Sequence, residues 1–155
     1  MIERSLSLAQ QWLHLKSSKV YAGQGQLLPS LLEWRVQTRP TPLSRDYSIL
    51  LRYRLDLSPT VIVEDPDLPL LAEGRRLPHV YQDRPPHLCL YLPDSGEWTP
   101  QKILAETILP WTDLWLFHFE EWLWSDDWKG GGEHPSDDDH VPRHLRRRYV
   151  AAMQS

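Results

Sequence analysis

The chain has 155 residues, of which 41% are hydrophobic and 25% are charged, and its formal net charge is -4. This length suits a single domain, residues 1–155, with one core, and the balance of residue types is that of a globular protein. The acidic balance disfavours a nucleic-acid partner, because proteins that bind phosphates usually carry a basic surplus. The sequence has no apolar run near the roughly 20 residues that cross a bilayer. It also shows no secretory signal, so we expect a cytoplasmic protein with no membrane partner.

Cys89 is the one cysteine in the sequence. A single cysteine forms no internal disulfide and builds no cysteine-rich zinc site. It is therefore either an inert buried thiol, which composition alone favours, or a nucleophile. The residues around it decide between these alternatives.

A short helix begins the predicted fold. Apolar residues recur at helical spacing over residues 5–16, without an interrupting proline or glycine. Gly23 and Gly25 then break this pattern.

Three strands follow in the prediction, at residues 32–38, 47–57 and 60–64. In the first two, apolar and polar side chains alternate, which is the period of a half-buried strand. The last two are joined by a short connection, so we expect an antiparallel meander, because a parallel crossover needs about a dozen residues or more.

Residues 65–100 form a proline-rich segment that contains Cys89. The prolines exclude a continuous helix and most central strands. A long segment without regular structure inside a compact domain is usually functional. We therefore expect this segment to be extended and to carry the active site.

Helices return in the C-terminal part. We expect a helical turn or two at residues 100–109 and a longer helix at residues 112–124. The longer helix collects aromatic residues on one face, and these are expected in the core: Trp111, Trp115 and Trp122. Trp124 and Trp128 lie beyond this stripe, beside acidic residues, and are candidates for an exposed partner surface. The order of elements predicts an α+β fold.

The C-terminal tail is polar near residues 133–145, and we expect it to be mobile. It holds residue types that bind zinc: His134, Asp137, Asp139, His140 and His144. Their spacing matches no compact metal-binding motif. We therefore expect a solvated tail and no metal site.

The segment around Cys89 resembles the signature of the ubiquitin-conjugating enzymes. Leu77-Pro78-His79-Val80-Tyr81 precedes Cys89-Leu90, and Trp98-Thr99-Pro100 follows. In that family, His-Pro-Asn-Val-Tyr precedes Cys-Leu, and Trp-x-Pro comes before a helix. The resemblance implies the UBC-like fold, with an N-terminal helix, an antiparallel β-meander, an extended active-site segment and C-terminal helices. It also makes Cys89 the expected thioester-forming nucleophile.

A more specific resemblance covers residues 31–135. It rests on a tryptophan- and glycine-rich pattern: Ile108-Leu109-Pro110-Trp111-Thr112, Trp115-Leu116, Phe119-Glu120, Trp122-Leu123, Gly130-Gly131-Gly132 and His134-Pro135. This pattern is similar to the stand-alone conjugating-enzyme-like proteins of short type II operons for cyclic-oligonucleotide-based anti-phage signalling (CBASS). The resemblance implies an acyl carrier that takes the C-terminus of a cGAS-like nucleotidyltransferase and passes it to an amine on a target protein. No cofactor is implied for this transfer, and ATP would be consumed by a separate activating enzyme if one is used.

Two residues depart from the family signature. Leu77 stands in place of the structural histidine, and His79 stands in place of the asparagine that stabilises the oxyanion or shapes the loop. We therefore expect His79 either to donate a hydrogen bond to the oxyanion or to organise the loop. His87 lies two positions before Cys89, on the same side of an extended segment, and is either a base for the thiol or a solvent-exposed loop residue.

Two carboxylates, Asp94 and Glu97, follow Cys89 closely in the sequence. Either one is a candidate to bind and orient an incoming lysine. The alternative is that these carboxylates are solvated or cap turns, as loop carboxylates commonly do.

Two other functions stay open at this point. The chain is alternatively a conjugating enzyme of another bacterial ubiquitin-like operon, loaded with a ubiquitin-like protein. It is otherwise a catalytically inactive adaptor that only binds partners. The departures at Leu77 and His79 motivate the adaptor, whereas a lone cysteine retained at position 89 argues against it.

Overall fold

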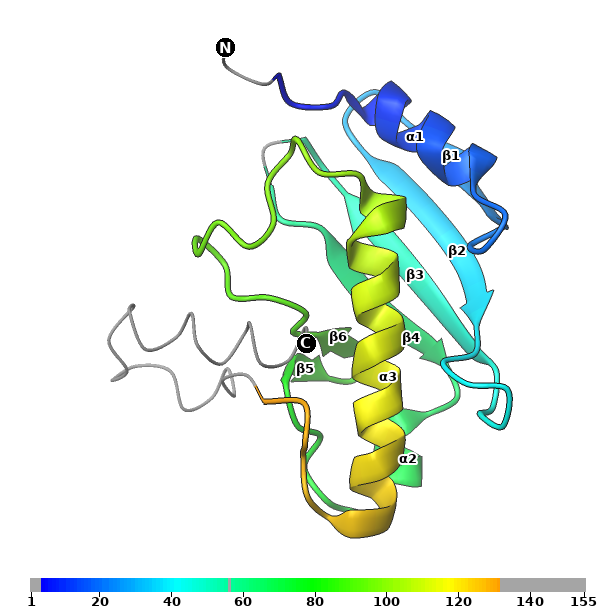
Figure 1. Cartoon of the computed structure of the whole chain (residues 1–155), viewed down its shortest axis with the longest axis vertical. Helices are drawn as coiled ribbons and strands as arrows, with labels where there is room; N and C mark the ends of the chain where they lie inside the picture. Colours follow the sequence, from blue (N-terminus) through cyan, green and yellow to red (C-terminus); the bar gives the residue numbers. More distant parts are fainter. Residues whose placement is uncertain (1–3, 56, 132–155) are drawn as a thin grey trace.

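The computed structural model describes residues 4–55 and 57–131. The elements follow in this order (Figure 1): α1 (Leu8–Ser17), β1 (Gly23–Leu27), β2 (Leu32–Thr38), β3 (Tyr47–Tyr53), β4 (Thr60–Asp65), α2 (Leu68–Leu71), β5 (Val80–Asp83), β6 (Pro86–Leu88), a 3-10 helix (Leu104–Glu106) and α3 (Ile108–Ser125). The predicted α+β fold is confirmed, and the arrangement is consistent with a UBC-like fold. No helix within the described residues is long and apolar enough to cross a membrane.

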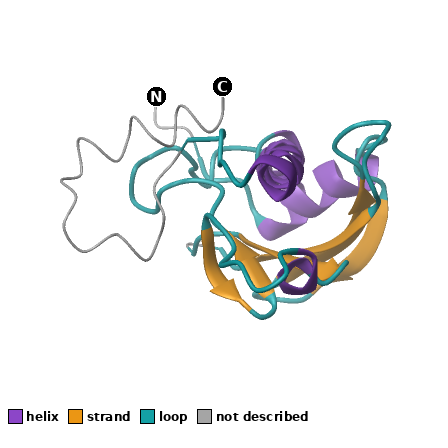
Figure 2. Ribbon diagram, turned by 90° about the horizontal axis from the view of Figure 1, so that it is seen from below, coloured by secondary structure: helices purple, strands orange, loops and turns teal. Residues whose placement is uncertain are grey.

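The strands form one six-stranded antiparallel sheet in the order β1-β2-β3-β4-β6-β5. The first four strands follow the order of the chain, and β2, β3 and β4 among them form the predicted meander. The β5–β6 hairpin then joins the sheet through β6, which leaves β5 at the far edge. Helices α1 and α3 lie on the same face of the curved sheet (Figure 2).

The hydrophobic core lies between this face and α3. Alternate side chains of β2 are buried, as the sequence predicts. The matching stripe of α3 is buried as well: Trp115, Leu116, Phe119 and Trp122. Burying a large apolar side chain contributes about 1.5–3 kcal/mol, so this stripe holds α3 firmly over the sheet. The start of α3 at Ile108 places Pro110 in the first turn, where a missing backbone N–H costs little.

Helix α1 begins later than predicted because Ser7 caps it. The Ser7 hydroxyl accepts a hydrogen bond from the Gln10 amide at 3.1 Å, and the Ser7 amide donates to the Gln10 side chain at 2.8 Å. This reciprocal pair is a capping box, which fixes the first turn. The buried side chain of Gln11 then donates to the Lys102 carbonyl at 2.8 Å and accepts from the Leu104 amide at 3.0 Å. These bonds tie α1 to the segment in front of α3.

Strand β1 is absent from the prediction, in which Gly23 and Gly25 only break a helix. In the structure these glycines pair with β2, opposite Val36 and Trp34. A Cβ on either glycine would collide with a backbone carbonyl of β2. Glycine at these positions therefore permits the close approach of two strands.

The proline-rich segment is more regular than predicted, because it contains α2, β5 and β6. Strand β6 starts at Pro86, a position where the missing amide of proline is tolerated. Residues 89–100 carry no helix or strand but contain turns and bends, and in the region of the helical turns predicted at 100–109 the structure has a 3-10 helix at Leu104–Glu106 before α3 begins. The predicted strand at 47–57 is too long: β3 ends at Tyr53, and the leucines that continue its alternation are exposed.

Candidate active site

Cys89 lies directly after β6, in the interior of the protein. Its side chain is only 7% exposed. Its backbone amide donates to the His79 carbonyl at 2.9 Å, and its Sγ lies 3.8 Å from the Tyr91 carbonyl, within range of a weak S–H hydrogen bond. Two neighbouring backbone segments therefore fix the position of the thiol.

His79 contacts Cys89 through a hydrogen bond between their backbones. His79 adopts a left-handed conformation with φ +49°, which costs a non-glycine residue about 1–3 kcal/mol. Its carbonyl accepts two hydrogen bonds that offset this cost, from the Cys89 amide and from the Trp115 indole N–H at 3.0 Å. The imidazole is buried against Trp128, with ring centroids 5.0 Å apart. These contacts agree with a loop-organising residue, and donation to an oxyanion stays a prediction.

His87 lies on the outer face of the sheet. It pairs with Ile62 of β4, which in turn pairs with Leu50 of β3. Cross-strand partners share a face, and the neighbours of Leu50 in β3, Ile49 and Leu51, point to the core instead.

The pKa of His87 is lowered, first by burial and then by the positive charge of Arg52. The imidazole is therefore neutral at pH 7 and able to accept a proton, but its contribution to catalysis stays a prediction.

The two predicted carboxylates lie in the loop that follows Cys89. Asp94 is exposed and adopts φ +61°, a conformation that short polar residues tolerate in turns. Glu97 is half-buried, and its amide donates to the Ser95 hydroxyl at 3.2 Å, while its carbonyl accepts from the Lys102 ammonium. Both residues thus shape the loop, and their binding of a substrate stays a prediction.

Tyr91 is part of this site, although the sequence analysis does not single it out. Its carbonyl accepts from the Tyr81 hydroxyl at 3.2 Å in addition to the Cys89 thiol. Its own hydroxyl is buried and has Ser58 as a polar neighbour, but no hydrogen bond of normal geometry forms. Burial raises the pKa of Tyr91; the neighbouring Ser58 hydroxyl lowers it in part, and negative charge on Cys89 and Asp94 raises it by smaller amounts. The sequence signal that could have identified Tyr91 as a site residue is its position two residues after Cys89.

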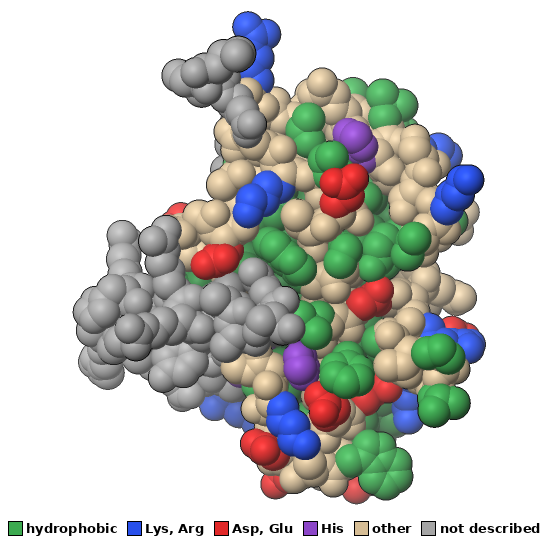
Figure 3. Space-filling view, viewed as in Figure 1, with side chains coloured by type: hydrophobic (Ala, Val, Ile, Leu, Met, Phe, Trp, Pro, Cys, Tyr) green, Lys and Arg blue, Asp and Glu red, His purple; other side chains and the backbone are tan. Residues whose placement is uncertain are grey.

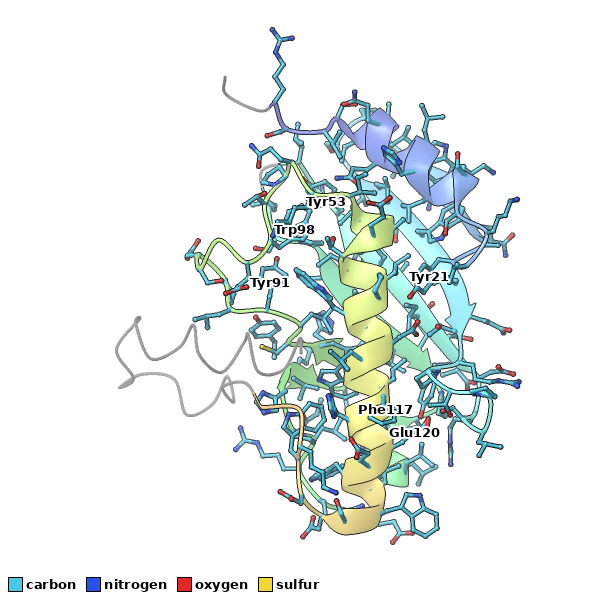
Figure 4. All side chains as sticks on the ribbon, in the orientation of Figure 1. Tyr21, Tyr53, Tyr91, Trp98, Phe117 and Glu120 are labelled. Atoms are coloured by element: carbon cyan, nitrogen blue, oxygen red, sulfur yellow. The ribbon has the colours of Figure 1, made fainter. Side chains whose placement is uncertain are left out.

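Three aromatic side chains, Tyr53, Trp98 and Tyr91, lie beside α3 (Figure 4). Tyr91 packs near Trp98 and Trp111, with ring centroids 6.5 and 6.1 Å apart. The predicted core tryptophans behave as expected: Trp115 and Trp122 are buried, and Trp111 is half-buried against the core. Hydrophobic side chains are also visible among charged ones over α3 (Figure 3).

The two tryptophans predicted to be exposed differ from each other. Trp124 is 94% exposed, as expected for a surface residue. The prediction is wrong for Trp128, whose ring packs against His79, Trp115 and His118. The reason is a chain reversal at Asp126, which adopts φ +58° after α3 and turns the chain back.

The predicted polar segment near 133–145, with its histidines and aspartates, lies outside the described residues. Among residues 4–55 and 57–131, no group of three or more His, Cys, Asp or Glu residues could hold a metal ion.

Comparison with protein families supplies the identity that this geometry suggests. A family model described as Type II CBASS E2 protein matches residues 11–135. Comparison with curated proteins gives no significant match. Because the family match covers most of the chain, this protein belongs to the family of Type II CBASS E2 proteins.

Proposed function

We propose that this protein is a ubiquitin-conjugating-like acyl carrier of anti-phage CBASS signalling, and that Cys89 forms a thioester with the C-terminus of a partner protein. The observation that carries the proposal is the lone cysteine, which follows β6 at the family's signature position and is held by the backbone of His79. From the resemblance, the cargo is a cGAS-like nucleotidyltransferase. Transfer to an amine on a target protein would then regulate signalling.

The chemistry has two acyl-transfer steps. In the first, the Cys89 thiolate attacks the carbonyl carbon of an activated carboxyl group, a C–S bond forms, and the activating group leaves with its bonding electrons. In the second, an amine attacks the thioester carbonyl, an amide bond forms, and the Cys89 thiolate leaves. The Cys89 thiol gives its proton to a base before the first step, and neutral His87 is a candidate for this base; in the second step the departing thiolate takes up the proton that the amine loses. A separate activating enzyme would spend ATP to activate the carboxyl group.

The burial of Cys89 has a consequence for loading. With 7% of the side chain exposed, a carboxyl terminus reaches Sγ only after neighbouring side chains move. Residues 89–103 have no regular secondary structure and include the exposed Asp94, so this loop is the segment that we expect to open. Asp94 and Glu97 then lie at the mouth of the site, where they would bind the incoming lysine.

The experiment that tests this proposal is a covalent trap. The protein is co-expressed with the nucleotidyltransferase of its operon and analysed on non-reducing gels and by intact mass. We expect an adduct with the summed mass of both proteins less one water, which thiol removes and Cys89→Ala lacks. A protein that stays unmodified with this partner and with ubiquitin-like candidates, each also supplied with its C-terminus activated as a thioester, would rule out the carrier mechanism.

A binding adaptor is the second candidate, and the burial of Cys89 favours it. An adaptor would retain its effect on signalling in cells when Cys89 becomes Ala. The carrier would lose that effect, so phage-protection assays with the same variant separate the two functions.

A further inference from the structure

The segment that follows α3 returns to the active site. Asp126 caps α3 in a left-handed conformation, and its amide donates to the Trp122 carbonyl at 2.8 Å. The chain reverses there, and residues 126–131 run from the foot of α3 back toward β5 (orange in Figure 1). This return brings a tryptophan to the residue that holds Cys89.

The tryptophan on this returning segment is Trp128, and its ring lies at the centre of a small aromatic cluster. The centroid of its ring is 5.0 Å from that of His79, 5.5 Å from Trp115 and 5.8 Å from His118. Its indole N–H donates to the Gly131 carbonyl at 2.8 Å, which fixes the orientation of the ring. Trp128 therefore joins α3 to the segment that precedes β5.

Gly130 allows the returning segment to pack closely against α3. A Cβ at this position would lie 2.8 Å from Cδ2 and 2.9 Å from Cγ of the His118 ring. His118 is itself paired with Glu121, at 3.1 Å between Nδ1 and Oε1. A side chain at position 130 would therefore force either the imidazole or the returning segment to move.

A second contact connects the same parts of the chain. Arg75 lies four residues before His79, and its guanidinium stacks over the Trp122 ring at 4.3 Å. It also pairs with Asp126 at 3.2 Å. The segment from Arg75 to His79 is thus held at its first end by the C-terminal end of α3. Its other end is held by Trp115, in the middle of α3, and by Trp128.

We propose that Trp128 is a positioning residue for Cys89, because its ring holds His79 in the left-handed conformation that aims the His79 carbonyl at the Cys89 amide. The proposal rests on the proposed function of Cys89 as the nucleophile. Without the ring, His79 loses one of the contacts that keep it at φ +49°, and its carbonyl is free to rotate away. The thiol would then leave its fixed position, which matters because small displacements of a reacting group slow a reaction strongly.

The test measures the thiol first and the acyl transfer second. The rate of Cys89 alkylation by iodoacetamide is recorded from pH 6 to 9 for the wild type, Trp128→Ala, Trp128→Phe and Trp124→Ala. Trp124 is the matched control, since it is a tryptophan that is 94% exposed. We expect Trp128→Ala to raise the alkylation rate at least about fivefold through local opening. We expect Trp128→Phe and Trp124→Ala to follow the wild-type pH profile.

Acyl transfer should change in the opposite direction. With the loaded partner, we expect Trp128→Ala to lower kcat about tenfold or more, with KM for the cargo unchanged, because position and not binding is lost. If thermal melting shows that Trp128→Ala does not fold, Gly130→Ala replaces it, since that variant displaces the segment but keeps the tryptophan.

Equal alkylation profiles for all variants would overturn the proposal, and so would an equal change in Trp124→Ala. Absence of a thioester in the wild type would refute the proposed function instead, while alkylation still decides the role of Trp128.

Discussion

Replacing Trp115 with Phe should loosen Cys89 through the His79 carbonyl, which accepts hydrogen bonds from both residues. Trp115 is fully buried, and its indole N–H donates to the His79 carbonyl at 3.0 Å. The same carbonyl holds the Cys89 amide. Phe keeps most of the ring that stacks on Phe119 but removes this donor.

The expected loss of stability has two parts. The lost hydrogen bond costs about 0.5–1.5 kcal/mol, because the His79 carbonyl keeps the Cys89 amide as a partner. The smaller ring leaves unfilled space in a closely packed core, which costs about 1–2 kcal/mol more. We therefore expect Trp115→Phe to lower the free energy of unfolding by about 1.5–3.5 kcal/mol.

A matched control exists in the same core. Trp34 is also buried, at 1% exposed, and its indole N–H donates to the Tyr21 carbonyl at 3.1 Å. Trp34→Phe makes the same chemical change far from the Cys89 segment in the sequence. Urea denaturation should give similar losses of stability for both variants, whereas iodoacetamide should alkylate Cys89 faster only in Trp115→Phe. Equal alkylation rates in the two variants, measured under conditions where both are folded, would refute this reasoning.

Three further predictions follow from individual contacts. Arg75→Ala should lower the free energy of unfolding by about 1–2 kcal/mol, mainly through the lost stacking on Trp122. Asp126→Asn removes the charge of a 75%-exposed partner but keeps a residue that tolerates the left-handed conformation, so it should cost less than about 0.5 kcal/mol; a larger loss in this second variant would contradict the order. The pKa of His87 is lowered in the folded protein, so the unfolded chain takes up a proton on this residue first as the pH falls. The contribution of His87 to stability is therefore complete above about pH 6.5 and is lost as the pH falls below it. His87→Gln should weaken the decrease of the melting temperature below that pH, and an unchanged decrease would contradict the assignment. Tyr91→Phe removes a buried hydroxyl without a hydrogen bond of normal geometry, so its melting temperature should equal or exceed that of the wild type, and a clear drop would show that the hydroxyl is satisfied.

The sequence predicts the parts of the fold that depend on local periodicity. The alternation in β2 and the aromatic stripe of α3 appear in the structure where the pattern places them. Strand β1 could not be predicted in this way, because Gly23 and Gly25 are required by the close approach of β2. A long-range contact of this kind leaves no local pattern.

The sequence predicts only part of the candidate site, because the rest depends on long-range contacts. Cys89 and His79 are found because they share a signature segment, and the structure joins them through one hydrogen bond. Trp128 is misplaced by the sequence analysis, because its position depends on the left-handed turn at Asp126. The outward position of His87 depends on its pairing with Ile62, which the sequence alone does not specify.

Peptide mapping of the thiol-labile adduct is the most direct test of whether Cys89 carries an acyl group. The co-expressed adduct is digested at low pH without reductant, and the joined peptides are sequenced by tandem mass spectrometry. We expect a branched peptide in which the Cys89 sulfur is bonded to the C-terminal carbonyl of the partner. A wild-type protein with a free Cys89, or an adduct attached through another residue, would contradict this expectation.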